Sequence, residues 1–230
     1  SGTSAMFVPL NSKIKVEELL KGVAVQSGND AAIALGEGIA GSEDAFARMM
    51  QEEATRIGLK KSTFRNATGL YHPEHLMTAR DLAVLARFLI KEYPDYSPMF
   101  AQREYNYTSS GPKKQTYRFF NRNPLLGVNL GVDGLKTGFI KESGYGVVAS
   151  AKQENRRLIL VVNGLATEAE RKDEGRRLLE WGFRSFGEFK LFDAGETVGS
   201  ARVWGAEHFY VPLSANGDLE VVLPRYPLNQ

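Results

Sequence analysis

The sequence predicts an α/β (α+β) protein, with helices before and after a group of strands and the start of a small β-rich domain at the end of the chain. Two observations support this prediction. Apolar residues recur at helical spacing before Pro94 and again after Thr167. Between these regions lie three short stretches of strand-like composition, two of them joined by a polar run that predicts a hairpin.

The first predicted helix runs from Glu17 to Gln26 and ends at a break, Ser27-Gly28-Asn29-Asp30. Helical composition resumes from Ala31 to Ile39. After Gly41, five apolar residues recur at helical spacing, and Gly58 is well placed as a C-terminal cap. These five residues are Phe46, Met49, Met50, Ala54 and Ile57.

A further helix is predicted from Ala79 to Lys91, because Thr78 can cap its first turn and Pro94 follows its end. Residues 95–128 are rich in tyrosine, asparagine, proline and glycine, which indicates irregular structure with short strands. The three predicted strands come next. They are Gly134 to Phe139, Gly146 to Ala151 and Leu158 to Val162, the last two joined by residues 152–156.

The last predicted helix starts at a capping box of Thr167 and Glu170 and carries Leu179, Phe183 and Phe186 on one apolar face. Beyond Phe189 the pattern changes to short apolar pieces broken by glycine, proline and asparagine. These pieces are Val198, Val203-Trp204, Phe209 to Val211 and Leu219 to Leu223. We therefore expect a first domain over residues 1–189 and the start of a β domain over 190–230, with too few strands to be stable alone.

Composition excludes several classes of protein. Of the 230 residues, 43% are hydrophobic and 24% charged, which is ordinary usage for a soluble globular chain. Lysine and arginine total 29 against 27 for aspartate and glutamate, so no nucleic-acid partner is predicted. The absence of cysteine excludes disulfides and thiolate metal sites. The first residues, Ser1-Gly2-Thr3-Ser4, have no signal-peptide pattern, so we expect any export signal to have been removed.

Two tripeptides stand out as candidates for chemistry: Ser27-Gly28-Asn29 in the interhelical turn and Lys136-Thr137-Gly138 on a strand. Each alone is a weak signal, because surface turns often contain such residues. Hydrolysis of an amide by a serine enzyme needs a proton carrier and fixed donors for the developing oxyanion and the substrate carboxylate. A serine, an asparagine and a strand-borne lysine could supply these groups.

Longer strings strengthen the signal. S-x-N followed by K-T-G is the pairing of penicillin-binding proteins and serine β-lactamases. The strings at 20–31 and 132–138, together with Gly144-Tyr145, 148–151 and 178–183, are similar to the low-molecular-mass serine D-alanyl-D-alanine carboxypeptidases of the peptidase S11 type. The resemblance covers most of the chain, from Gly2 to Phe186. It implies a β-lactamase/transpeptidase-like fold, an antiparallel sheet flanked by helices with the Lys136 strand at the edge of the cleft.

The resemblance also implies roles for individual residues. Ser27 would take part in proton transfer to the leaving group, Asn29 would contact the substrate amide, and Lys136 would orient Ser27 electrostatically. Thr137 and Gly138 would lie where a peptide or β-lactam docks by strand addition. Arg171 matches the family arginine that helps to hold the terminal carboxylate, although a solvated arginine in a helical first turn is the alternative.

The chain departs from the family pattern in two ways. Many relatives have histidine after K-T-G, where this chain has Phe139. The family nucleophile is the serine of an S-x-x-K motif upstream of S-x-N, and we expect that segment to be missing from these 230 residues. Two formal matches begin at Ser12 and Ser110, but the first lies among polar residues and the second contains Gly111-Pro112, which disfavours a helix.

Other residues have weaker interpretations. His72 and His75 flank Pro73-Glu74 in a predicted loop, and zinc normally needs a third protein ligand, so no metal or other cofactor is expected. Three tyrosines could form a sugar-stacking surface, although ordinary strand packing is favoured. They are Tyr105, Tyr107 and Tyr117.

The resemblance implies an exported enzyme of the periplasm or cell envelope, with roles in the cell wall and cell shape. It would remove the terminal D-alanine from peptidoglycan stem peptides and bind β-lactam antibiotics. Membrane association through segments outside these residues stays open. An endopeptidase acting on peptidoglycan cross-links and a non-catalytic peptidoglycan-binding or partner-binding module remain alternatives. A class A β-lactamase is disfavoured, because no E-x-x-x-N arrangement lies between Asn29 and Lys136.

Overall fold

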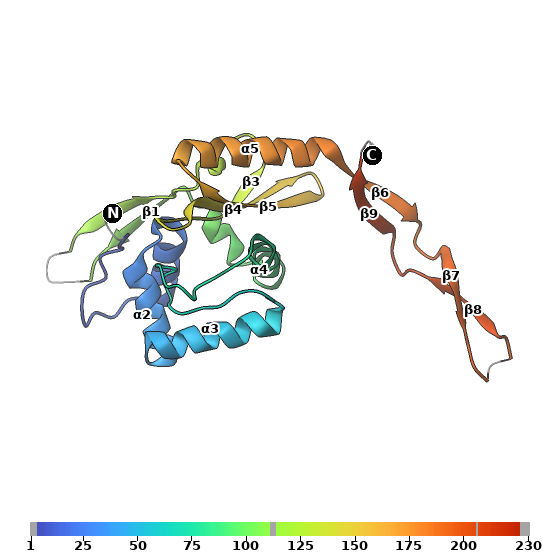
Figure 1. The fold of residues 1–230 in the computed structure, drawn as a ribbon, viewed down its shortest axis with the longest axis horizontal. Coiled ribbons are helices and arrows are strands. Elements are labelled where there is room, and N and C mark those ends of the chain that lie inside the picture. The colour runs from blue at the N-terminus through green and yellow to red at the C-terminus, as the bar shows by residue number, and fades with distance from the viewer. Residues whose placement is uncertain (1–3, 111–113, 206, 226–230) are drawn as a thin grey trace. The chain divides into compact units, whose positions relative to one another are not determined.

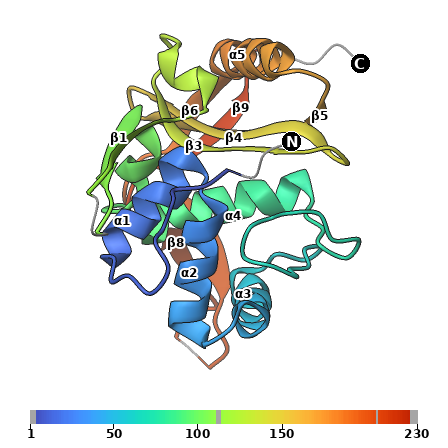
Figure 2. The ribbon, with the colours of Figure 1, turned by 90° about the vertical axis from the view of Figure 1, so that its left-hand side faces the viewer.

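The computed structural model describes residues 4–110, 114–205 and 207–225. The chain divides into two compact units, Ser1–Leu179 and Glu180–Gln230. In the first unit, a three-stranded sheet lies between helices on both faces (Figures 1 and 2). This mixed arrangement is the α+β class that the sequence predicts.

Helices α1 to α4 lie before the sheet. Their bounds are α1 Val16–Lys21, α2 Asn29–Ala40, α3 Glu43–Ile57 and α4 Ala79–Glu92. The Thr78 side chain accepts the N–H of Asp81 at the start of α4, and Ser42 does the same for Ala45 in α3. Gly58 closes α3 with a left-handed φ of 86°. The predicted caps of α3 and α4 are confirmed.

Helix α1 continues into a π-helical turn, η1 Gly22–Gln26, which hydrophobic spacing did not distinguish from α-helix. Gly22 packs closely against the Met6 side chain. A Cβ there would lie 2.3 Å from the Met6 sulfur, so a larger residue would require the buried Met6 side chain to move. The turn ends at Ser27, whose φ of 61° is left-handed and uncommon for a residue other than glycine.

The central sheet is antiparallel, with strand order β3-β4-β5. Its strands are β3 Val132–Ile140, β4 Gly144–Gln153 and β5 Arg156–Leu165. They are longer than predicted, because Lys152 and Gln153 pair with Arg157 and Arg156 and leave only a short turn. Helix α5, Glu168–Ser185, begins on one face of the sheet, and α4 packs on the other (Figure 1).

A hairpin of β1 Glu104–Thr108 and β2 Thr116–Phe120 packs on the first helices. The short 3₁₀ turns η2 Ser97–Ala101 and η3 Pro124–Gly127 flank it in sequence. Tyr105 and Tyr107 are 8% and 3% exposed, so the strand-packing interpretation is confirmed for both. They belong to a buried cluster that also contains Met6, Leu19, Val25, Ala31 and Phe119.

The second unit contains four strands in two antiparallel pairs, β6 with β9 and β7 with β8. Their bounds are β6 Phe186–Phe192, β7 Thr197–Arg202, β8 Tyr210–Ser214 and β9 Leu219–Pro224. Two local predictions were wrong. Phe186 starts β6 instead of extending the helix, and Trp204 lies in a turn with 91% of its surface exposed.

None of the helices in the described ranges is long and apolar enough to cross a membrane.

Candidate active site

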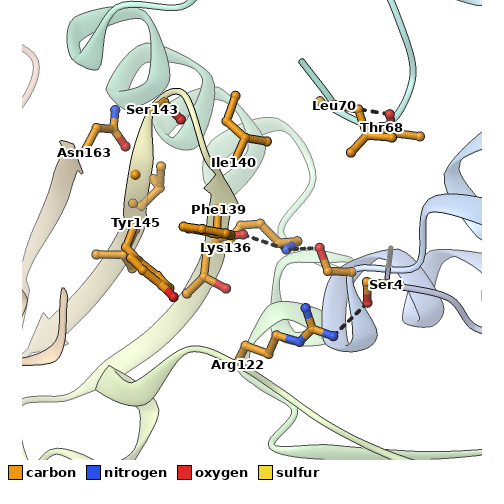
Figure 3. Close-up of a pocket in the computed structure, with 18 of the residues that line it drawn as sticks. Ser4, Thr68, Leu70, Arg122, Lys136, Phe139, Ile140, Ser143, Tyr145 and Asn163 are labelled. Carbon is orange, nitrogen blue, oxygen red and sulfur yellow. Dashed lines mark hydrogen bonds between the residues drawn. The ribbon is translucent and has the colours of Figure 1, made fainter. Parts of the chain in front are cut away.

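A cleft of about 760 Å³ opens in the first unit. Three segments far apart in sequence form its walls: the turn at Ser27–Asn29, the β3 segment 136–140 and the loop 67–71. Figure 3 shows side chains from β3 and β4 facing the Ser4 segment across this space. The two tripeptides that the sequence singled out therefore lie on opposite walls of one cleft.

The Ser27 turn is held by backbone hydrogen bonds on both sides. The N–H groups of Ser27 and Gly28 both donate to the carbonyl of Gly22, the latter at 3.0 Å. The N–H of Asn29 donates to the Ser4 carbonyl at 2.9 Å. Asn29 is the first residue of α2, so its side chain lies at the helix start and lines the cleft.

Lys136 connects the two walls. Its Nζ donates to Ser27 Oγ at 2.8 Å and to the backbone oxygen of Thr137 at 2.8 Å. Burial, together with the nearby guanidinium groups of Arg122 and Arg171, lowers the pKa of Lys136 to about 8. The lysine is therefore a cation at neutral pH, but it loses its charge much more easily than an exposed lysine does.

Thr137 and Gly138 continue along β3 beside Lys136 and line the cleft. Thr137 is 8% exposed and pairs with Val147 of β4. Gly138 pairs with Gly146, and a Cβ added to Gly138 would meet no atom within 4 Å. In the described parts of the chain β3 has a strand partner on one side only, so its outer edge can take an added strand.

Arg171 lies in the first turn of α5 and is only 4% exposed, so it is not the solvated arginine of the alternative interpretation. Its guanidinium carbon lies 5.4 Å from the centre of the Tyr145 ring. Glu168 lies 3.6 Å away, and the Arg122 carbonyl accepts a long 3.4 Å bond. Burial lowers the pKa of Arg171, and its Nε has no hydrogen-bond partner among the described residues.

Arg122 is a residue of the cleft that the sequence analysis missed. Its Nη2 donates to Ser4 Oγ at 2.8 Å (Figure 3). Ser4 Oγ in turn donates to the Gln26 carbonyl at 2.8 Å. Arg122 belongs to no recognised motif, and its position depends on the hairpin that precedes it. The one weak signal for Arg122 in the sequence is that it is the single basic residue between Arg118 and Lys136.

The loop wall, residues 67–71, depends on Asn66, which was also missed. Asn66 Oδ1 accepts from the N–H of Gly69 at 2.7 Å and from the N–H and hydroxyl of Thr68. Its Nδ2 donates to the Leu70 carbonyl at 2.9 Å. The Glu43 side chain accepts the N–H of Ala67 at 3.0 Å. One asparagine thus shapes the tip of the loop, as Asx turns commonly do.

Phe139 forms an apolar wall at the position after K-T-G. Its ring centre lies 4.2 Å from that of Tyr145, its cross-strand partner, and 48% of the residue is exposed. Phe139 thus places an aromatic ring without a titratable group at the position where a histidine would carry an imidazole.

The formal S-x-x-K matches lie outside the cleft. Ser12 Oγ donates to the Pro9 carbonyl at 2.7 Å, Ser110 is exposed, and neither lines the cleft. Gly111, Pro112 and Lys113 fall outside the described residues. His72 Nδ1 and His75 Nδ1 both accept backbone N–H groups, from Glu74 and Arg65. No three histidine, cysteine, aspartate or glutamate side chains gather to hold a metal within the ranges that the structure describes.

Comparisons with known proteins agree with this geometry. Residues 1–167 match the peptidase S11 family, described as D-alanyl-D-alanine carboxypeptidase. The chain is 39% identical over 225 residues to D-alanyl-D-alanine carboxypeptidase DacC of Escherichia coli K12, covering 97% of this chain and 54% of that protein. The chain thus spans about half the length of the curated relatives it matches.

Two solved structures are similar. Penicillin-binding protein 5 of Haemophilus influenzae matches with a TM-score of 0.85 and 35% identity, covering 97% of this chain and 63% of that one. Penicillin-binding protein D2 of Listeria monocytogenes in its cefotaxime-bound form matches with a TM-score of 0.68 and 29% identity, covering 79% of this chain and 72% of that one. Both show the predicted β-lactamase/transpeptidase-like fold. The chain belongs to the peptidase S11 family, the D-alanyl-D-alanine carboxypeptidases.

Proposed function

We propose that these residues form most of the substrate cleft of a serine D-alanyl-D-alanine carboxypeptidase, which removes the terminal D-alanine from peptidoglycan stem peptides. The observation that carries the proposal is the hydrogen bond between Lys136 and Ser27 across the cleft, with Arg171 buried in its wall. A serine proton carrier, a fixed cation and a carboxylate-binding arginine are the groups that this hydrolysis needs beside a nucleophile.

In this proposal the nucleophile is the serine of an S-x-x-K segment, and it attacks the carbonyl carbon of the last peptide bond. Ser27 passes a proton to the departing nitrogen, D-alanine leaves, and water then hydrolyses the acyl-enzyme ester. Lys136 holds the Ser27 hydroxyl through its 2.8 Å bond, and Asn29 contacts the substrate amide. The enzyme reads the peptide's end through Arg171, because a guanidinium binds a carboxylate with two parallel hydrogen bonds.

β-Lactams and stem peptides dock along the free edge of β3, at Thr137 and Gly138. The exposed edge and the open space beside Gly138 support this mode of binding. So does the likeness to a penicillin-binding protein with cefotaxime bound. A substrate in the cell wall implies that the enzyme acts in the cell envelope or periplasm. We assign the cleft to a penicillin-recognising domain over residues 1–189 and the remainder to a β domain over 190–230.

The test is Lys136→Ala in an enzyme in which an S-x-x-K segment precedes residue 1. Penicillin acylation and D-alanine release should both fall about 100-fold, the effect typical of losing one oriented electrostatic group. Stopped-flow acylation measures the first rate directly. Lys152→Ala, on the exposed end of β4, is the matched control and should leave both rates unchanged. Rates for Lys136→Ala that stay within about threefold of the parent would remove Lys136 from the mechanism.

A further inference from the structure

Glu168 is a residue of the cleft that the proposed reaction does not use. It is the first residue of α5, and it lines the cleft together with Arg171, which lies three residues further along the helix. Its Oε1 lies 3.6 Å from Arg171 Nη2, so the two side chains form an ion pair at i,i+3 spacing. The two partners differ in burial, because the arginine side chain is 4% exposed and the glutamate side chain is 71% exposed.

The start of α5 does not need Glu168 as a cap. The Thr167 hydroxyl accepts the N–H of Glu170 at 3.1 Å, and the Glu170 carboxylate accepts the N–H of Ala166 at 2.8 Å. These two bonds complete the predicted capping box. The Glu168 carboxylate takes no part in them, and its contact is with the buried arginine.

The two charges are close enough to attract each other but too far apart for a hydrogen bond. The other neighbours of the Arg171 guanidinium are the Tyr145 ring at 5.4 Å and the Arg122 carbonyl, which accepts a long 3.4 Å bond. Arg171 Nε has no hydrogen-bond partner among the described residues. Glu168 therefore reduces the positive potential that the arginine presents to the cleft without taking up its hydrogen-bond donors.

A carboxylate ligand and Glu168 compete for the same guanidinium. Two carboxylates beside one arginine repel each other, and water at an exposed side chain weakens this repulsion without removing it. A ligand that forms two direct hydrogen bonds to Arg171 still displaces Glu168, because only a screened attraction holds the exposed side chain. The same repulsion acts on the D-alanine product, whose carboxylate must leave the arginine after each cycle.

We propose that Glu168 is a displaceable counter-ion of Arg171, which weakens the binding of terminal carboxylates to the cleft and so favours release of the D-alanine product. Glu168 acts through Arg171 and does not bind the substrate itself. This inference rests on the proposed function, because it takes Arg171 as the carboxylate site.

The experiment measures KM and kcat for two peptides that end in D-alanyl-D-alanine, one with a free carboxylate and one with a terminal amide, in the enzyme with an S-x-x-K segment ahead of residue 1. At low salt Glu168→Gln should lower KM for the acid by about two- to fivefold, the size expected for an exposed ion pair, and leave KM for the amide unchanged. Glu168→Lys reverses the charge and should lower KM for the acid further. Both effects should shrink at about 1 M salt, where screening is strong. Inhibition by added D-alanine should strengthen in parallel.

Glu174→Gln is the matched control and should leave KM for both peptides unchanged, because Glu174 forms the same i,i+3 pair with Arg177 on α5 but does not line the cleft. A KM for the acid that stays the same or rises in Glu168→Gln would overturn the inference, and so would an equal change for acid and amide. A parent that hydrolyses both peptides equally well would remove Arg171 as the carboxylate site, and the inference with it. If the parent releases no D-alanine, the proposed function fails and the inference fails with it.

Discussion

The protonation state of Lys136 depends on its neighbours as well as on its burial. Burial, Arg122 and Arg171 lower its pKa to about 8 from 10.5, so the ammonium that holds Ser27 is present below pH 8 and is lost above it. Arg122 contacts Ser4. Through their positive charges, Arg122 and Arg171 can therefore set the pH range of the reaction without direct contact to the reacting atoms.

The first prediction follows from this dependence. In the enzyme with an S-x-x-K segment, the penicillin acylation rate should fall as pH rises through about 8, because the charge on Lys136 is lost. Arg122→Gln removes a nearby positive charge, so the ammonium form becomes more favourable and the alkaline midpoint should move upward. Arg122→Lys keeps the charge and serves as the control. An alkaline midpoint that is the same in all three proteins would exclude Lys136 as the titrating group.

Arg171 supplies the second residue-scale prediction. Its buried guanidinium has an unsatisfied Nε, and a planar guanidinium suits a carboxylate better than an amide. Arg171→Ala should therefore reduce hydrolysis of a peptide with a free terminal carboxylate far more than hydrolysis of the same peptide amide, by about 10-fold or more. The measurement is kcat/KM for both peptides. Equal losses on both would leave Arg171 with a structural role only.

Residues in recognised motifs could be predicted from the sequence, and residues that depend on long-range packing could not. Ser27 and Lys136 lie in strings that a local pattern identifies, and the structure brings them within hydrogen-bond distance. Arg122 reaches the cleft only through its contact with Ser4, which is far away in sequence. Local signals do not contain that information, and the same holds for the burial of Arg171.

At the scale of elements, the loop 67–71 is the wall that side-chain hydrogen bonds hold in place. It contains no regular secondary structure, and its tip depends on the side chain of Asn66 together with one bond from Glu43. By contrast, the β3 wall is supported along its whole length by pairing with β4. Changes at Asn66 should therefore affect binding before they affect global stability.

The prediction at this scale is that Asn66→Ala raises KM for peptide hydrolysis by about three- to tenfold, with a small change in kcat. The mutation removes the acceptor of Thr68 and Gly69 and the donor to Leu70, so the loop samples more conformations. Asn66→Asp keeps the acceptor and should recover most of the affinity. Thermal unfolding should show little change in Tm for either variant. A Tm loss as large as that of a core mutation would mean that Asn66 supports the fold and does not specifically shape the loop.

Element boundaries followed the sequence wherever a cap marked them. Thr78 and Gly58 fix the ends of their helices through their own side-chain and backbone geometry. Where no cap marks the end of an element, its predicted boundary was less accurate. Phe186 fits the apolar face of α5 by spacing, yet it pairs with Pro224 in β6, which only the later strand could reveal. The π-helical turn η1 was likewise not distinguished from α-helix by hydrophobic spacing.

At the scale of the whole molecule, the second unit has little buried surface of its own. Many large apolar side chains of its strands are exposed, among them Phe209, Tyr210, Val222 and Leu223. Two-stranded sheets are marginally stable in water, so packing against further residues would be needed to hold this unit together. The cleft, in contrast, is formed by the first unit alone.

The last prediction concerns the 230 residues by themselves, which should form no stable covalent adduct with penicillin. Three serines line the described cleft, Ser4, Ser27 and Ser143, and none of them begins an S-x-x-K motif. Ser27 is the one that contacts a lysine. With a pKa of about 8, Lys136 is protonated at pH 7 and donates to Ser27 Oγ, so it cannot accept the proton that a nucleophilic serine must lose.

Intact-mass spectrometry after incubation with benzylpenicillin at pH 7 tests this directly, and the same chain joined to an S-x-x-K segment is the positive control. An adduct on Ser27 would mean that Lys136 acts as its base, and such an adduct should then form faster above pH 8, where the lysine is neutral. An adduct on Ser12 or Ser110 would instead restore one of the formal motifs, although neither serine lines the cleft. The expected result is a chain of unmodified mass, because the electrostatic groups of the cleft stabilise an oxyanion only after a nucleophile has created it.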